Sequence, residues 1–157
     1  MTETTDTDLV KEGDIAADYL ETFLDIADLP GENLDLDVEG DRAYVYISGG
    51  DLSRLIGKRG EVLDSLQELT RLAVTRETGN RSRLMLDIDG HRARHKDQLA
   101  EIGRKAAEKA LKSGESVKLL PMNPYERKVV HDAIGAAGAV SASEGEEPKR
   151  YIVVSAE

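Results

Sequence analysis

The sequence predicts an α+β protein made of two small domains in tandem. Segments with apolar residues at helical spacing are interspersed with short segments in which apolar and polar residues alternate, as in half-buried strands. A chain of 157 residues with 39% hydrophobic residues is long enough for two small cores. We expect a disordered acidic tail over residues 1–8, a first domain over residues 9–90 ending at Gly90, and a second over residues 91–157.

The first domain is predicted to have the order helix, strand, strand, helix, helix, strand. The expected elements are a helix over residues 9–30, strands over 34–38 and 43–47, a short helix up to Ile56, a helix over 62–74 and a strand over 83–89. Gly40-Asp41 between the first two strands is a hairpin signal, and Gly79-Asn80 ends the last helix.

The second domain is predicted to have the order helix, strand, helix, strand, strand. The expected elements are a charged helix over residues 92–112, a strand over 117–120, a helix over 125–134 and strands over 139–143 and 150–155. Asn123-Pro124 suits the start of the second helix, because Asn caps helices and Pro fits the first turn.

The charge of the chain is unevenly distributed. The net charge is −10, but residues 1–48 hold 14 acidic and 2 basic residues, while the rest holds 17 acidic and 19 basic residues. The near-neutral remainder therefore permits local contacts to nucleic acid, whereas nonspecific coating of duplex DNA is not expected. The absence of cysteine excludes disulfides, and no apolar run is long enough for membrane insertion.

The loop Gly57-Lys58-Arg59-Gly60 is the first candidate binding site. Two glycines let the backbone turn tightly and approach a sugar-phosphate chain, and the following helix N-terminus attracts phosphate. Lys58 and Arg59 add two cations at the tip. We expect this loop to clamp single-stranded RNA, with bases laid against an apolar groove formed by Leu55, Ile56 and the adjoining strand.

Arg127 and His131 are the second candidate. Their four-residue spacing places them on one helix face, where they could reach a single ligand. Arginine binds phosphate with a bidentate fork, and histidine can stack on a base or donate to a phosphate. Asn123 and Lys128, on the same segment, complete the predicted RNA-binding residues. An exposed helix face is the alternative interpretation of this pair.

Other motifs do not support metal, cofactor or catalytic chemistry. His91 and His95 have metal-ligand spacing, but no Glu completes an H-E-x-x-H motif. The glycine loop lacks the P-loop spacing, and an apparent calcium loop from Asp35 has Tyr46 at its twelfth position. We expect no catalytic residues, no metal and no cofactor, and therefore no enzyme.

Two longer segments resemble known domains. Residues 56–67, with Gly57 to Gly60, resemble a type II KH domain, and residues 121–131, with the run Met-Asn-Pro-Tyr-Glu-Arg, resemble the Arg-x-x-x-His domain. Their order resembles that of the bacterial Jag proteins, also called KhpB. The resemblance implies cytoplasmic RNA binding, post-transcriptional control linked to cell elongation and division, a chaperone role, and pairing with a second small KH protein or with itself. Many relatives carry an extra N-terminal domain, whose functions are not transferred.

One alternative function remains open from the residues themselves. The acidic first third could dock a basic protein, which would make the chain a protein-interaction adaptor with a KH fold that has lost RNA binding. The intact basic loop between two glycines favours RNA instead.

Overall fold

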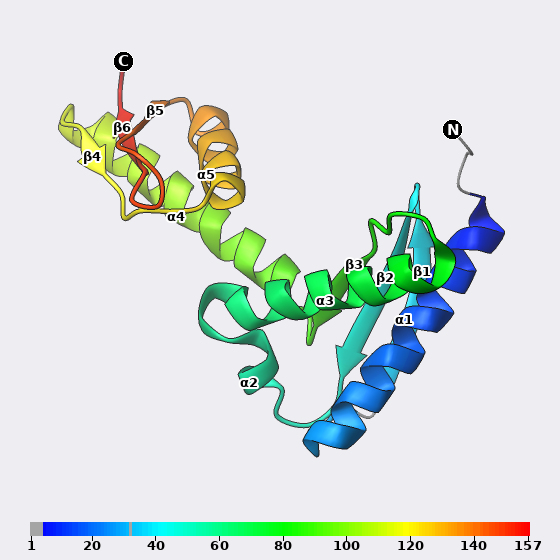
Figure 1. The fold of residues 1–157 in the computed structure, drawn as a ribbon. Coiled ribbons are helices and arrows are strands. Elements are labelled where there is room, and N and C mark those ends of the chain that lie inside the picture. The colour runs from blue at the N-terminus through cyan, green and yellow to red at the C-terminus, as the bar shows by residue number, and fades with distance from the viewer. Residues whose placement is uncertain (1–4, 32) are drawn as a thin grey trace. The chain divides into compact units, whose positions relative to one another are not determined.

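A computed structural model describes residues 5–31 and 33–157. The chain divides between Arg92 and Ala93 into two compact units, which we call unit 1 (residues 1–92) and unit 2 (residues 93–157). The division falls two residues beyond Gly90, in the first turn of a helix. Figure 1 shows the elements of both units along the chain.

Unit 1 has the predicted order of elements. They are α1 (Asp6–Ala27), β1 (Asn33–Glu39), β2 (Arg42–Ser48), α2 (Ser53–Ile56), a 3-10 turn η1 (Lys58–Gly60), α3 (Glu61–Thr78) and β3 (Met85–Ile88). The sheet order is β1-β2-β3, with β1 antiparallel and β3 parallel to β2. The α-β-β-α-α-β arrangement predicted from the sequence is thus confirmed.

The first helix begins earlier than its apolar residues predict. The Thr5 side chain accepts a hydrogen bond from the backbone N–H of Asp8, and the Asp8 carboxylate accepts one from the backbone N–H of Thr5. This capping box stabilises a first turn that apolar spacing does not reveal. Residues 6–8, predicted to lie in a disordered tail, are therefore helical, and residues 1–4 of that predicted tail lie outside the described residues.

The core of unit 1 lies between the sheet and its two long helices. Helices α1 and α3 contact each other and cover one face of the sheet (Figure 1). The strands contribute alternate side chains such as Val45 and Ile47, which are almost fully buried together with Leu20 and Leu63. This packing holds α2, η1 and the start of α3 at one end of β2.

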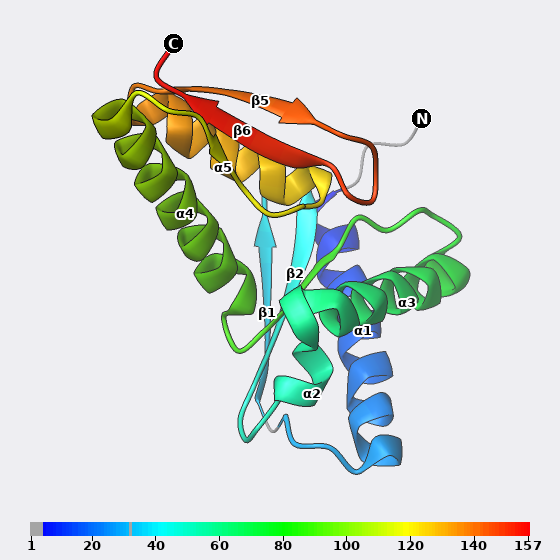
Figure 2. The same cartoon turned by 90° about the vertical axis from the view of Figure 1, so that its left-hand side faces the viewer.

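Unit 2 has a second core and a second sheet. Its elements are α4 (His91–Ser113), which begins two residues before the unit boundary, β4 (Val117–Lys118), α5 (Pro124–Ala136), β5 (Val140–Glu144) and β6 (Tyr151–Ser155). The sheet is antiparallel with order β4-β6-β5, and Figure 2 shows α5 lying along the β5–β6 hairpin. Val130, Ile134, Ile152 and Val154 are fully buried. The predicted α-β-α-β-β order is confirmed.

Candidate nucleic-acid interface

The Gly57–Gly60 loop has a backbone that requires both glycines. Gly57 has a φ of 72°, and a β-carbon there would lie 2.5 Å from Cγ2 of Val62. Gly60 has a φ of 80°, and a β-carbon there would lie 2.8 Å from Nε2 of His91. Arg59 between them is also left-handed, with a φ of 57°. The loop is therefore a tight turn in which Gly57 is partly exposed and Gly60 is buried, with the exposed residues Lys58 and Arg59 between them.

The two cations of this loop are available to a ligand. Lys58 and Arg59 are exposed, and neither side chain makes a hydrogen bond or ion pair with any residue in the described part of the chain. They directly precede α3, whose N-cap Gly60 has no side chain to satisfy the first N–H groups of the helix. Two exposed cations next to a helix N-terminus suit a phosphate chain.

Leu55 does not line the predicted apolar groove. Leu55 is only 4% exposed and belongs to the core of unit 1, so it supports the loop from below and does not line a surface groove. Ile56 is partly exposed and packs against the same core. Helix α2 is a single turn that packs against α3, and Leu55 is its one buried residue.

The free edge of β3 is covered by polar side chains of the protein itself. Leu86 donates its backbone N–H to Oε1 of Gln67 at 3.0 Å, and its carbonyl accepts from Nε of Arg92 at 2.7 Å. The Leu84 carbonyl accepts from Nε of Arg71 at 2.7 Å. Bases laid against this strand would therefore meet guanidinium and amide groups before they meet the backbone.

Arg92 also ties this edge to α3. Its guanidinium lies 2.9 Å from Oδ1 of Asp64 and 3.1 Å from Oε1 of Gln67. Gln67 is 8% exposed although it is polar, and its carbonyl oxygen is shared between Leu86 and Arg92. The network positions the helix that follows the glycine loop relative to the edge strand.

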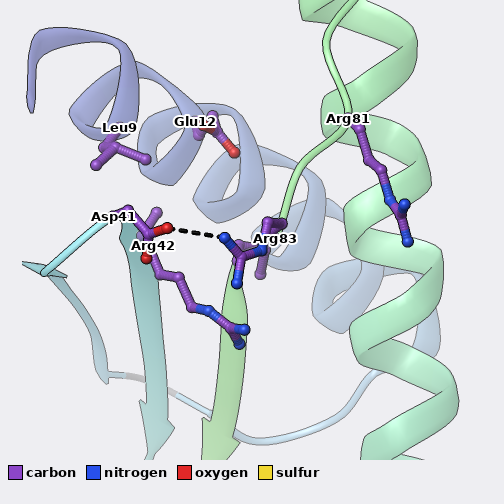
Figure 3. A pocket seen from close by; sticks show the side chains of 8 residues that line it. Leu9, Glu12, Asp41, Arg42, Arg81 and Arg83 are labelled. Carbon is purple, nitrogen blue, oxygen red and sulfur yellow. Dashed lines mark hydrogen bonds and ion pairs between the residues drawn. The ribbon is translucent and has the colours of Figure 1, made fainter. Parts of the chain in front are cut away.

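A second group of arginines surrounds a cavity at the other end of the sheet. The cavity, of about 330 Å³, lies between α1, the β1–β2 turn and the segment leading into β3 (Figure 3). Arg83 forms an ion pair with Asp41 at 2.8 Å, and Arg42 donates to the thioether of Met85 at 3.2 Å. Figure 3 shows Arg81 projecting away from the other two arginines. The cavity holds acidic as well as basic groups, so it is not a purely cationic site.

In unit 2, Asn123 caps the helix that carries the second candidate site. Its side chain accepts from the backbone N–H of Glu126 at 2.8 Å, and Oε1 of Glu126 accepts from the backbone N–H of Asn123 at 3.0 Å. Oε2 of Glu126 lies 3.0 Å from Nε2 of His95 on α4. Glu126 is 4% exposed, so this carboxylate is an internal link between the two helices.

Arg127 is buried and engaged with the protein. The residue is 9% exposed, and its guanidinium donates to the Met122 carbonyl at 2.7 Å. The same guanidinium forms an ion pair of 2.6 Å with Oε1 of Glu147, in the loop between β5 and β6. The fork predicted to bind phosphate thus holds a carboxylate of the protein itself.

His131 is held by the neighbouring strand. Its Nδ1 lies 2.6 Å from Oγ of Ser141 and its Nε2 lies 2.8 Å from Oγ of Ser143. Partial burial lowers the pKa of His131 below its ordinary value, the charge of Arg127 lowers it further, and Asp132 opposes the shift. A neutral imidazole is therefore favoured, and it can accept from one hydroxyl while it donates to the other. Lys128, next to Arg127, is exposed.

The described residues contain no group of three or more potential metal ligands. His95, which shares metal-ligand spacing with His91, contacts Glu126, while His91 packs against Gly60. In the same part of the chain, no helix is long and apolar enough to cross a membrane.

Comparison with known proteins identifies the domain family of each unit. A family model described as "KhpA/KhpB, KH domain" matches residues 14–86, and the family model of the Arg-x-x-x-His domain matches residues 97–156. The chain is 37% identical over 147 residues to the RNA-binding protein KhpB of Clostridium symbiosum, covering 90% of this chain and 65% of that protein. It is 33% identical over 142 residues to the RNA-binding protein KhpB of Bacillus subtilis, covering 87% of this chain and 67% of that protein.

The chain belongs to the KhpB family. The resemblance seen in the sequence is confirmed, since both matched domains occur in the predicted order. The chain spans about two thirds of the length of the two KhpB relatives compared above. Gly57 to Gly60 lie within the segment that matches the KH family model, and Arg127 and His131 lie within the segment that matches the Arg-x-x-x-His domain.

Several residues of the interface were missed by the sequence analysis. Glu126 carries a local signal, because Asn-x-x-Glu before an apolar run is a capping-box pattern. Ser141 and Ser143 lie two apart on a strand, which places both on the face that meets His131. Gln67 and Glu147 carry no such signal, because their partners are distant or depend on a loop conformation.

Proposed function

We propose that this protein binds single-stranded RNA without catalysis, and that the Gly57–Gly60 loop clamps the sugar-phosphate backbone. The observation that carries the proposal is the geometry of this loop. Its two glycines have left-handed φ values and no room for a β-carbon, while the two residues between them are exposed cations whose side chains have no partner among the described residues. A loop needed only to connect two helices would need the glycines, but it would not need two exposed cations without partners.

The chemistry of the loop favours phosphate contact. Lys58 and Arg59 supply positive charge at the N-terminal end of α3, whose first N–H groups have no side-chain cap at Gly60. Contacts of this kind set affinity without reading sequence. Base preference would then come from the polar edge of β3, where Arg71 and Arg92 place partly exposed guanidinium groups.

Unit 2 supplies the second contact region in this proposal. The predicted residues are Arg127 and His131 on α5, with Lys128 and Asn123 beside them. Two weak sites on one chain bind more tightly together than either alone, because the second binding event is intramolecular. The relatives named RNA-binding protein KhpB match this chain across both domains, which supports a shared mode of binding.

The wider role is part of the same proposal. By family resemblance, the protein acts in the cytoplasm as a post-transcriptional regulator linked to cell elongation and division. Its expected protein partner is a second small KH protein, and the name of the matched KH family, KhpA/KhpB, supports that pairing.

Charge reversal of the loop tests the proposal. The double variant Lys58→Asp/Arg59→Asp is expected to abolish crosslinking of the full chain to single-stranded RNA and to leave the fold intact, since both side chains are exposed. The matched control is Lys109→Asp/Lys112→Asp on exposed positions of α4, which changes the net charge equally. Crosslinking that survives in the loop variant, or falls equally in the control, would contradict the clamp.

A second candidate function is favoured by one surface of α1. Asp14, Asp18, Glu21 and Asp25 are all exposed and recur at helical spacing, which forms an acidic stripe. Such a stripe suits a basic protein partner, as expected of an adaptor. Size-exclusion chromatography and filter binding with and without RNA separate the two functions, because an adaptor would show no RNA retention.

A further inference from the structure

The Arg127–Glu147 ion pair joins a buried cation to an accessible carboxylate. The side chain of Arg127 is 11% exposed, whereas that of Glu147 is 49% exposed. Their closest atoms are 2.6 Å apart, as expected for a charge-assisted hydrogen bond. The Glu147 carboxylate is therefore the member of the pair that solvent can reach.

Arg127 requires an anion where the Glu147 carboxylate lies. The Met122 carbonyl satisfies one nitrogen of the guanidinium at 2.7 Å but leaves its charge uncompensated. A buried cation without a counter-charge is costly, because desolvation is not repaid. Any group that displaces Glu147 must consequently bring its own negative charge.

Glu147 lies in a part of the hairpin outside the strand pairing. The last paired residues of β5 and β6 are Glu144 and Tyr151, so residues 145–150 form the connecting loop. The loop closes on itself through a hydrogen bond of 2.8 Å from the Lys149 N–H to the Glu146 carbonyl. Strand β5 is held to α5 independently, through the contacts of its two serines with His131. Release of the Glu147 carboxylate therefore breaks no pair of the β5–β6 ladder.

We propose that Glu147 occupies the phosphate site of Arg127 and that an RNA phosphodiester must displace it to bind. The proposal rests on the proposed function, since it identifies Arg127 as a phosphate contact. Carboxylate and phosphodiester both present anionic oxygens to a guanidinium fork, so one can take the place of the other. The displaced carboxylate returns to water, and the charge of Arg127 stays compensated.

The competition lowers the apparent affinity of unit 2 for RNA. When a site is open in only a fraction of the molecules, its apparent affinity equals its intrinsic affinity multiplied by that fraction. Removal of the Glu147 charge should therefore tighten RNA binding through Arg127, although the substitution adds no new contact.

The test compares two neighbouring glutamates in the full chain. Glu147→Gln removes the competing charge, and Glu146→Gln removes the same charge from an exposed neighbour whose side chain makes no hydrogen bond or ion pair with described residues. Fluorescence anisotropy with a labelled single-stranded oligoribonucleotide of about twelve nucleotides measures affinity. We expect Glu147→Gln to bind roughly 3- to 10-fold more tightly than Glu146→Gln. Equal affinities of the two variants would overturn the proposal.

The Nε–H resonance of Arg127 provides a second measurement that does not depend on a change in affinity. RNA added to the wild-type chain should shift this resonance, because a phosphodiester then replaces the Glu147 carboxylate at the guanidinium. An Arg127 resonance unmoved by saturating RNA would overturn the proposal.

Failure of the displacement and failure of RNA binding give different results. If the wild-type chain binds RNA and Lys58→Asp/Arg59→Asp does not, while the two glutamate variants behave alike, only the role of Glu147 is wrong. If neither the wild-type chain nor Glu147→Gln binds RNA, the proposed function itself is wrong.

Discussion

A β-carbon at Gly60 would lie 2.8 Å from Nε2 of His91, so the ring of His91 occupies the space that any other residue at position 60 would need. The two residues are 31 positions apart in sequence and join the end of the glycine loop to the start of α4. The second glycine of the loop is thus required by tertiary packing as well as by its own backbone conformation, with a φ of 80°.

Gly60→Ala should destabilise unit 1 more than Gly79→Ala. Both glycines have left-handed φ values, 80° and 78°, but a β-carbon at Gly79 meets nothing within 4 Å. Each variant carries the same conformational cost of about 1–2 kcal/mol. The difference in their free energies of unfolding therefore measures the clash with His91. We expect an additional loss of about 1 kcal/mol for Gly60→Ala, measured by amide hydrogen exchange of α3. Equal losses would mean that His91 moves aside freely.

Gln67→Leu should expose the edge of β3. The substitution removes the oxygen that accepts from the Leu86 N–H and from Arg92, and it places an apolar side chain of similar size in the same space. An unsatisfied buried N–H costs about 1–3 kcal/mol. We expect faster hydrogen exchange at the Leu86 amide and a lower stability of unit 1. Gln98→Leu on an exposed position of α4 is the control, and a Leu86 amide as protected as in that control would contradict the network.

Asn123 should act as a helix cap that aspartate can replace. Asn123→Ala removes the acceptor for the Glu126 N–H and should lower the free energy of unfolding of unit 2 by about 1 kcal/mol. Asn123→Asp keeps the acceptor and should retain the stability, as measured by thermal denaturation. An RNA affinity that falls for Asn123→Asp at unchanged stability would assign Asn123 a direct contact with RNA as well.

The stability of unit 2 should decrease in acid through His131. The pKa of His131 is lowered by burial and by Arg127, so below the ordinary histidine pKa of about 6.5 the unfolded state binds more protons than the folded state. Stability is thus retained above that pH and falls as the pH decreases, by at most about 1.4 kcal/mol per pH unit for one group.

His131→Gln provides the comparison for this pH dependence. The amide keeps a polar side chain opposite Ser141 and Ser143 but does not titrate. Thermal denaturation of both chains from neutral to acidic pH should show a steeper decrease for the wild type. Parallel curves would show that the protonation of His131 is not linked to folding.

The sequence by itself determined the order of the elements and the family. Apolar spacing located the helices and strands because burial of one face imposes a period on each element, as α3 and β2 show. The Gly57–Gly60 motif could be recognised because left-handed turns need glycine wherever they occur. The sequence identified Asn123 as a helix cap because a proline follows it. Thr5 was not identified as a cap, since short polar caps resemble ordinary loop residues.

Only the tertiary structure decided which side chains remain available to a ligand. Leu55 and Arg127 were both expected at a binding surface, yet Leu55 belongs to the core and Arg127 is paired with Glu147. Neither outcome follows from helical spacing, because burial and ion pairing depend on which distant segment packs against the helix. Lys58 and Arg59 stay exposed because no other described segment packs against them or supplies them with a counter-charge.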